Sequence, residues 1–244
     1  MLKSAGERYH FIGIGGAGMS GIARILLQSG YRVSGSDLAS NGPTQKLAEL
    51  GAVISQGHSA DNITDEIEAV VISTAVPADN PEVLAARAKG IPVVHRGEML
   101  AALMATRQGI AVAGAHGKTT TSAMVALVLE KNGVDPTIVI GGELNELGGN
   151  AKLGRGPHLV AEADESDGSF LRLRPQYVVV TNIENDHLDH YQTVENITQA
   201  FREFIGFVPA DGLAVLCAND PRLKDIAGKC TQRCLTYGIG VKAD

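Results

Sequence analysis

Residues 110–129 read IAVAGAHGKTTTSAMVALVL, and this stretch decides the fold. A short apolar run leads into a turn that contains glycine, and the turn leads into an alanine-rich helical pattern. A strand, a tight loop and a helix in this order bring free backbone N–H groups and the positive end of the helix dipole to one point, where anions bind. The stretch therefore predicts a phosphate-binding loop at the end of a strand.

Four residues of this loop have tasks in nucleotide binding. Gly114 and Gly117 let the backbone wrap without Cβ clashes, Lys118 can reach the β- and γ-phosphates, and the Thr119 hydroxyl is placed to bind Mg²⁺. The loop departs from the usual G-x-x-x-x-G-K-[ST] spacing, because the outer glycine would fall at Val112 and stands at Gly114 instead. The alternative interpretation is a helix start that carries a solvated lysine.

Composition restricts the classes of protein to which the chain can belong. The 244 residues carry a net charge of -6 and are 44% hydrophobic, which is typical of a globular cytoplasmic protein with a sizeable core. The acidic balance argues against nucleic-acid partners, and the lack of a long apolar span argues against a membrane partner. Three cysteines without a C-x-x-C pair support neither a disulfide framework nor a zinc site.

Another glycine loop lies earlier in the chain. Residues 10–18 read HFIGIGGAG, so Gly13, Gly15 and Gly18 have the G-x-G-x-x-G spacing. Asp37 ends the next predicted strand about twenty residues later, where a ribose-binding acid is expected. This βαβ pattern predicts a site for a dinucleotide or for the pyrophosphate of a nucleotide sugar. The alternative is a glycine turn that serves only close helix packing.

The rest of the chain alternates between strand and helix patterns, which predicts parallel sheets covered by helices on both faces. The pattern resets near residues 106–108, so we expect one domain over residues 1–106 and a second over residues 107–244. Residues 141–156 are rich in glycine and have no periodicity, which predicts a long loop. No closing element follows the last predicted strand, so we expect the chain to be part of a longer protein.

Acidic residues gather at the end of the predicted strand that spans residues 158–163. The cluster contains Glu162, Asp164, Glu165 and Asp167, and ligands bind at this edge of an α/β sheet. Mg²⁺ needs only one or two carboxylates when phosphates supply its other ligands. His187 follows another strand and is expected on the same edge as Glu162 and Lys118. A solvated acidic turn and a structural histidine are the alternatives.

Six motifs in one order carry a resemblance to a known family: HFIGIGGAGMSGIA, GSD, NPEV, AGAHGKTTT, EADESDGSFL and TNIENDHLDHY. With these motifs the sequence closely resembles the Mur ligase family. The resemblance implies a Rossmann-like UDP-sugar domain followed by an incomplete P-loop-type α/β ATPase domain, with a third, C-terminal domain missing. It further implies ATP and Mg²⁺ as cofactors, and ATP-dependent ligation of L-alanine to UDP-N-acetylmuramate through an acyl phosphate, in peptidoglycan precursor synthesis.

The resemblance also implies a role for each matching residue. Lys118, Glu162 and His187 are the expected catalytic residues, and Thr119, Glu162 and His187 are the expected metal ligands. The ATP site is expected to contain Gly114, Ala115, His116, Gly117, Lys118, Thr119, Thr120 and Asn182, with Asn182 near the adenine. The UDP-sugar site is expected to contain Gly13, Gly15, Gly16, Ala17, Gly18, Met19 and Asp37. Ala115 departs from the family pattern, which usually has threonine there.

Three other functions stay open at this point. The chain could be a module that binds a sugar nucleotide and catalyses nothing. It could be the related ligase that recycles a tripeptide onto UDP-N-acetylmuramate, since the two enzymes share the task of the first domain. An NAD-dependent oxidoreductase built on the G-x-G-x-x-G loop is the third, but it leaves the second phosphate loop and the acidic strand end without a purpose.

Overall fold

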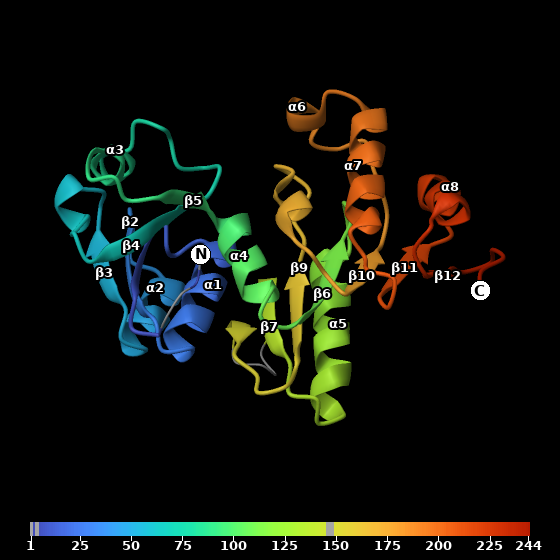
Figure 1. Ribbon diagram of the computed structural model, residues 1–244, viewed down its shortest axis with the longest axis horizontal. Coiled ribbons are helices and arrows are strands. Elements are labelled where there is room, and N and C mark those ends of the chain that lie inside the picture. Colours follow the sequence, from blue (N-terminus) through green and yellow to red (C-terminus); the bar gives the residue numbers. More distant parts are fainter. Residues whose placement is uncertain (1, 3–4, 145–148) are drawn as a thin grey trace. The chain divides into compact units, whose positions relative to one another are not determined.

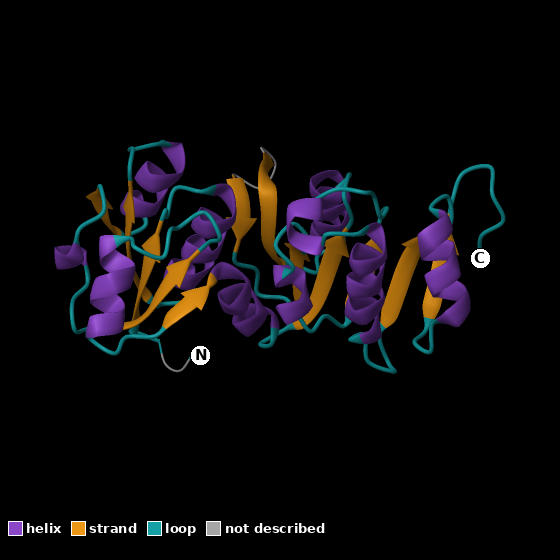
Figure 2. Cartoon of the chain, turned by 90° about the horizontal axis from the view of Figure 1, so that it is seen from above, coloured by secondary structure: helices purple, strands orange, loops and turns teal. Residues whose placement is uncertain are grey.

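A computed structural model describes residues 2, 5–144 and 149–244, and it divides into two compact units. Unit 1 comprises Met1–Ala102 and Gly141–Leu153, and unit 2 comprises Leu103–Ile140 and Gly154–Asp244. Figure 1 shows each unit as strands flanked by helices, and Figure 2 marks the same strands in orange and helices in purple. None of the helices in the described ranges is long and apolar enough to cross a membrane.

Unit 1 is built on a five-stranded sheet in the order β3-β2-β1-β4-β5. All the pairings between these strands are parallel. The elements are β1 (Arg8–Ile12), α1 (Ala17–Gln28), β2 (Arg32–Asp37), α2 (Gly42–Glu49), β3 (Val53–Gln56), the 3₁₀ turn η1 (Ala60–Asn62), β4 (Ile67–Ile72), α3 (Pro81–Ala88), β5 (Val93–His95) and α4 (Arg96–Met104), which ends in unit 2.

The order of this sheet reverses at β1, and that reversal positions the first candidate site. The chain moves outward from β1 to β2 and β3, then returns to the other side of β1 as β4. Right-handed crossovers therefore put α1 and α2 on one face of the sheet and α3 on the opposite face. The loops after β1 and β4 diverge at this point and leave a crevice at the carboxyl ends of the strands.

Unit 2 contains most of a second sheet, whose strand order is β12-β11-β10-β6-β9-β7-β8. Its pairings from β12 to β7 are parallel. The elements are β6 (Gln108–Ala113), α5 (Lys118–Lys131), β7 (Thr137–Leu144), β8 (Gly149–Lys152), β9 (His158–Glu162), η3 (Ser169–Arg172), β10 (Tyr177–Val180), α6 (Leu188–Tyr191), α7 (Val194–Gly206), β11 (Leu213–Cys217), α8 (Pro221–Lys229) and β12 (Cys234–Tyr237).

Continuous apolar strands explain why the middle of this sheet is buried on both faces. Residues 110–113 of β6 and 159–161 of β9 are buried throughout, as parallel strands covered by helices should be. Helix α7 turns Phe201 and Phe204 inward, and both rings contact Phe170, with centroids 5.2 and 4.8 Å apart respectively. These aromatic contacts fix the segment that follows the acidic end of β9.

The structure confirms the predicted α/β class with parallel sheets, and it corrects one element. The predicted loop over residues 141–156 is wrong at residues 141–144, which extend β7, and at Gly149–Lys152, which form β8. Residues 145–148 of that predicted loop lie outside the described residues. These strands were predicted as a loop because they are rich in glycine. A strand that pairs with a neighbour can form without β-branched side chains. The patterns also gave no prediction for α8, a short helix that begins at Pro221.

Candidate functional site

The first glycine loop connects β1 to α1 at the sheet reversal of unit 1. Gly13 has φ of 74°, and its N–H donates to the Ser36 carbonyl at 2.8 Å. The Gly15 N–H donates to Asp37 Oδ2 at 2.8 Å. A Cβ at Gly15 would lie 2.5 Å from Asn41 Nδ2 and 2.9 Å from the Asp37 carboxylate, so an alanine there would displace these two side chains. Asp37 therefore holds the loop in the structure, besides standing where a ribose-binding acid is expected.

A cavity of about 540 Å³ opens above this loop at the carboxyl edge of the sheet. Glycine backbone, one acid, one histidine and several small residues line it. They are Gly13, Gly15, Gly16, Met19, Asp37, Leu38, Asn41, His58, Ser73, Ala75, Val76, Pro77 and Asn80. The volume lies within the usual range of small-molecule sites. Of the residues predicted for the UDP sugar, Gly13, Gly15, Gly16, Met19 and Asp37 line this cavity, while Ala17 and Gly18 belong to the first turn of α1.

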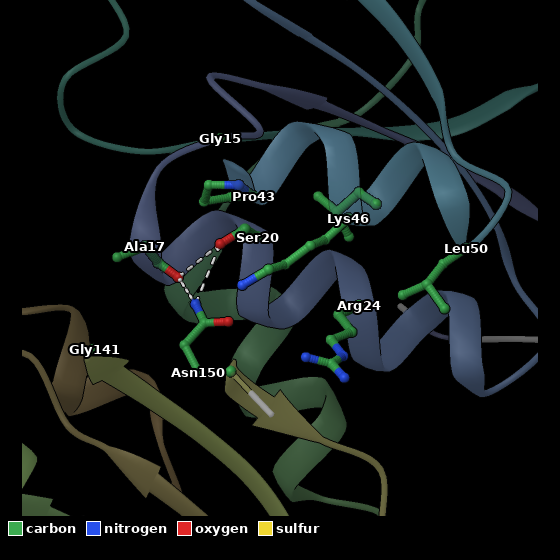
Figure 3. A pocket seen from close by; sticks show the side chains of 11 residues that line it. Gly15, Ala17, Ser20, Arg24, Pro43, Lys46, Leu50, Gly141 and Asn150 are labelled. Atoms are coloured by element: carbon green, nitrogen blue, oxygen red, sulfur yellow. Dashed lines mark hydrogen bonds between the residues drawn. The ribbon is translucent and has the colours of Figure 1, made fainter. Parts of the chain in front are cut away.

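A smaller cavity of about 130 Å³ lies beside α1, between α2 and β8 (Figure 3). Arg24 and Lys46 line it together with Asn150 of β8. The Asn150 amide donates to the Ala17 carbonyl at 2.7 Å and to Ser20 Oγ at 3.2 Å. Asn150 thus anchors β8 to the first turn of the helix that begins at the glycine loop.

The second glycine loop connects β6 to α5 in unit 2. Gly114 has φ of 134° and Gly117, the N-cap of α5, has φ of 82°, and both values favour glycine. The end of β10 holds the loop: the His116 N–H donates to Asn182 Oδ1 at 2.9 Å, and Thr181 Oγ1 donates to the His116 carbonyl at 2.6 Å. Asn182, expected near the adenine, supports the phosphate loop in this structure.

Lys118 lies at the start of α5 and bonds to a buried carboxylate. Its ammonium donates to Glu165 Oε1 at 2.7 Å and to the Gly114 carbonyl at 2.6 Å. The Glu165 side chain is only 3% exposed. Burial raises the pKa of the Glu165 carboxyl, and the Lys118 ammonium offsets part of that shift. His187 Nε2 lies 3.7 Å from the same Oε1 atom. Lys118, Glu165 and His187 therefore form one cluster.

Glu162 is the last residue of β9, and its carboxylate suits a bound cation. Its Oε1 atom is buried and has no hydrogen-bond partner, and Glu162 pairs in register with Val112 of β6, the strand that leads into the phosphate loop. Within the described ranges no three His, Cys, Asp or Glu side chains form a ready metal cage. One carboxylate and the exposed Thr119 hydroxyl fit a Mg²⁺ ion whose remaining ligands come from nucleotide phosphates.

Two residues at these sites were not singled out from the sequence, and a third was given no role of its own. Glu165 was expected only as a member of the acidic cluster after β9, and Asn41 carries a capping-box signal only for α2. His58, which lines the larger cavity, stands in a short loop after β3 with no pattern that indicates a ligand contact. Only the tertiary structure shows that these three residues lie at the sites.

Two family patterns match the chain in succession. The one described as Mur ligase family, catalytic domain, matches residues 8–108, and the Mur ligase middle domain matches residues 112–244. The chain belongs to the Mur ligase family. The first match ends and the second begins within β6 (Gln108–Ala113) of this Mur ligase.

The curated relatives of this Mur ligase chain are longer than it is. It is 60% identical over 230 residues to the UDP-N-acetylmuramate–L-alanine ligase of Pelotomaculum thermopropionicum. This match covers 94% of this chain and 50% of the relative. It is 57% identical over 245 residues to the ligase of the same name from Desulforamulus reducens, covering 100% of this chain and 53% of the relative. The chain therefore spans about half the length of the curated relatives that it matches.

Solved structures show the same fold for this Mur ligase. UDP-N-acetylmuramate-alanine ligase from Thermotoga maritima superposes with a TM-score of 0.86 at 35% identity, covering 97% of this chain and 53% of that one. UDP-N-acetylmuramate:L-alanyl-gamma-D-glutamyl-meso-diaminopimelate ligase from Neisseria meningitides gives 0.87 at 30% identity, covering 95% and 78%. Fold likeness therefore does not separate the two kinds of ligase.

Proposed function

We propose that this chain carries the UDP-sugar and ATP sites of an enzyme that ligates L-alanine to UDP-N-acetylmuramate. The observation that carries the proposal is the cluster of Lys118 and His187 around Glu165 beside the second glycine loop. A phosphate loop next to buried acids at a strand end is what an ATP-dependent ligase needs, and a sugar-nucleotide module has no use for it. The 57–60% identity to two alanine ligases favours alanine over a tripeptide as the acceptor. A cytoplasmic location, where ATP is plentiful, fits this function.

In this proposal the first glycine loop binds the UDP sugar. The Gly15–Gly16 backbone at the start of α1 faces the pyrophosphate, and the helix dipole contributes attraction. Asp37 holds Gly15 in place and lies in the same cavity, within reach of the uridine ribose. The predicted residues Ala17 and Gly18 supply the first N–H groups of the helix.

At the second glycine loop, the proposed chemistry is phosphoryl transfer followed by amide formation. The lactyl carboxylate of the muramoyl group attacks the γ-phosphate of ATP and ADP leaves; the amine of alanine then displaces phosphate from the resulting acyl phosphate. Lys118 moves its ammonium from Glu165 to the phosphates and neutralises their charge. Little covalent help is needed, because positioning and charge neutralisation supply most of the rate enhancement in such reactions.

Thr119 and Glu162 are the residues that would hold Mg²⁺ with the ATP phosphates, and His187 is proposed as a further ligand. When bound, the ion supplies charge neutralisation at the γ-phosphate. Glu165 orients Lys118 and lies beside His187, so it keeps both side chains at the loop. Asn182 and Thr181 keep the His116 backbone fixed while ATP binds.

The proposal predicts that Lys118→Ala abolishes ATP binding and leaves UDP-N-acetylmuramate binding within about twofold, because Lys118 and the first glycine loop lie in different units. Calorimetry with each ligand measures both effects, and Lys131→Ala, at the far end of α5, is the matched control. Tight sugar-nucleotide binding by the unaltered chain, without any ATP binding, would favour the binding module. Equal ATP affinity in Lys118→Ala and the unaltered chain would refute the ligase proposal.

A further inference from the structure

A fully buried carboxylate lies beneath the larger cavity of unit 1. Glu82 of α3 receives hydrogen bonds from Ser36 Oγ at 2.5 Å and from the Asn62 amide at 2.5 Å. His58 Nδ1 lies 3.2 Å from Glu82 Oε2, and His10 Nε2 lies 3.6 Å from Oε1. These four side chains come from β1, β2, the loop after β3 and η1, so Glu82 joins the segments beneath the cavity.

Glu82 is ionised in this network. Burial by itself would raise the pKa of the carboxyl, but the polar contacts from His10, Ser36 and Asn62 outweigh it and lower the pKa to about 2. An ionised carboxylate can only accept hydrogen bonds. Every neighbour that bonds to Glu82 must therefore contribute a proton.

This requirement fixes the proton of the His58 ring. The Ser36 hydroxyl proton is used on Glu82 Oε2, so Ser36 Oγ, which lies 2.9 Å from His58 Nδ1, can only accept there. Nδ1 thus faces two acceptors, Ser36 Oγ and Glu82 Oε2, and must carry the proton. In the neutral imidazole the other nitrogen, Nε2, is then a bare acceptor.

The His58 ring lies between this buried network and the cavity. Its side chain is 19% exposed and lines the cavity, whereas Glu82, on the Nδ1 side of the ring, is fully buried. Nε2 stands on the side of the ring that faces away from Glu82. The cavity is therefore lined by a histidine ring whose Nε2 atom is an acceptor, and the Asp37 carboxylate lines the same cavity.

We propose that His58 is a specificity-determining residue that accepts a hydrogen bond from a donor group of the bound uridine nucleotide. This inference rests on the proposed function, which places a sugar nucleotide in this cavity. Uridine offers two kinds of donor, the uracil N3–H and the ribose hydroxyls. Cytosine carries an acceptor at N3, so a contact with N3–H would also select uridine over cytidine nucleotides.

The test compares UDP with three analogues that each lack one donor: N3-methyl-UDP, 2′-deoxy-UDP and 3′-deoxy-UDP. Calorimetry at about pH 8 gives the affinity of the unaltered chain and of His58→Leu for each ligand. We expect the leucine variant to bind UDP about fivefold more weakly, the usual value of one neutral hydrogen bond. We also expect it to lose the discrimination against one analogue, which identifies the donor.

Two further variants make the test specific. Gln56→Ala changes an exposed side chain of β3 outside this cavity and should leave every affinity unchanged. His58→Gln keeps an acceptor oxygen on a chain of similar reach, so it should retain more UDP affinity and more discrimination than His58→Leu. This variant also tests the contact if the leucine variant does not fold.

The outcomes separate this inference from the proposed function. If UDP binds the unaltered chain and His58→Leu keeps the same affinity and the same ratios among the four ligands, the contact with His58 is refuted and the UDP-sugar site stands. If the leucine variant does not fold, the contact is refuted when His58→Gln binds all four ligands more weakly by one common factor, so that its discrimination against each analogue equals that of Gln56→Ala. Failure of UDP to bind the unaltered chain refutes both.

Discussion

At the scale of single residues, Glu82 links stability to pH. Its pKa is lowered from 4.5 to about 2, so the folded state gains stability from this group above pH 4.5 and loses it as the pH falls toward 2. We expect urea unfolding of the unaltered chain to show that this group contributes about 1 kcal/mol less to the free energy of unfolding at about pH 3.5 than at neutral pH. Glu82→Gln lacks that part of the pH dependence. Glu203→Gln, an exposed change on α7, is the control and should retain it. Parallel pH profiles for Glu82→Gln and the control would contradict the lowered pKa.

At the scale of elements, β8 supports the helix that starts at the first glycine loop. The Asn150 amide satisfies the Ala17 carbonyl and Ser20 Oγ, and the Leu153 N–H donates to Gln28 Oε1 at the other end of α1. We expect Asn150→Ala to lower the free energy of unfolding by about 1–2 kcal/mol, because two hydrogen bonds are lost. Hydrogen exchange of the α1 amides should also increase. Gln45→Ala, an exposed change on α2, controls for the loss of an amide. Unchanged exchange in α1 would show that β8 does not support the helix.

At the scale of the whole molecule, each unit carries its own glycine loop, and one glycine-to-alanine substitution should distort each loop. A Cβ at Gly15 would meet Asn41 and Asp37, and a Cβ at Gly114 would collide with Thr181 Oγ1 and lie 3.1 Å from the Asn182 backbone. We therefore expect Gly15→Ala to weaken UDP binding more than tenfold and to spare ATP, and Gly114→Ala to do the reverse. Each variant is the control for the other in calorimetry with UDP and with ATP. Loss of both ligands in either variant would contradict two separate sites.

Local patterns predicted the helices and strands well where the physical signal is local. The strand, loop and helix predicted over residues 110–129 are present as β6, the loop at residues 114–117 and α5. The strand predicted over residues 158–163 is present as β9 (His158–Glu162), because its apolar run is a local signal. The end of β7 at residues 141–144 and strand β8 were missed, since both form through strand pairing and β8 also contacts α1.

The sequence by itself determined the fold class, the two glycine loops and the acidic strand end, because glycine spacing, a following helix and apolar periodicity act over a few neighbouring residues. Only the tertiary structure decided that Lys118 bonds to Glu165 and that His58 shares its proton with Ser36 and Glu82. These partners lie 22–47 residues apart in the chain. Their contacts depend on strand order and burial, which bring side chains together across a sheet and which no local pattern records.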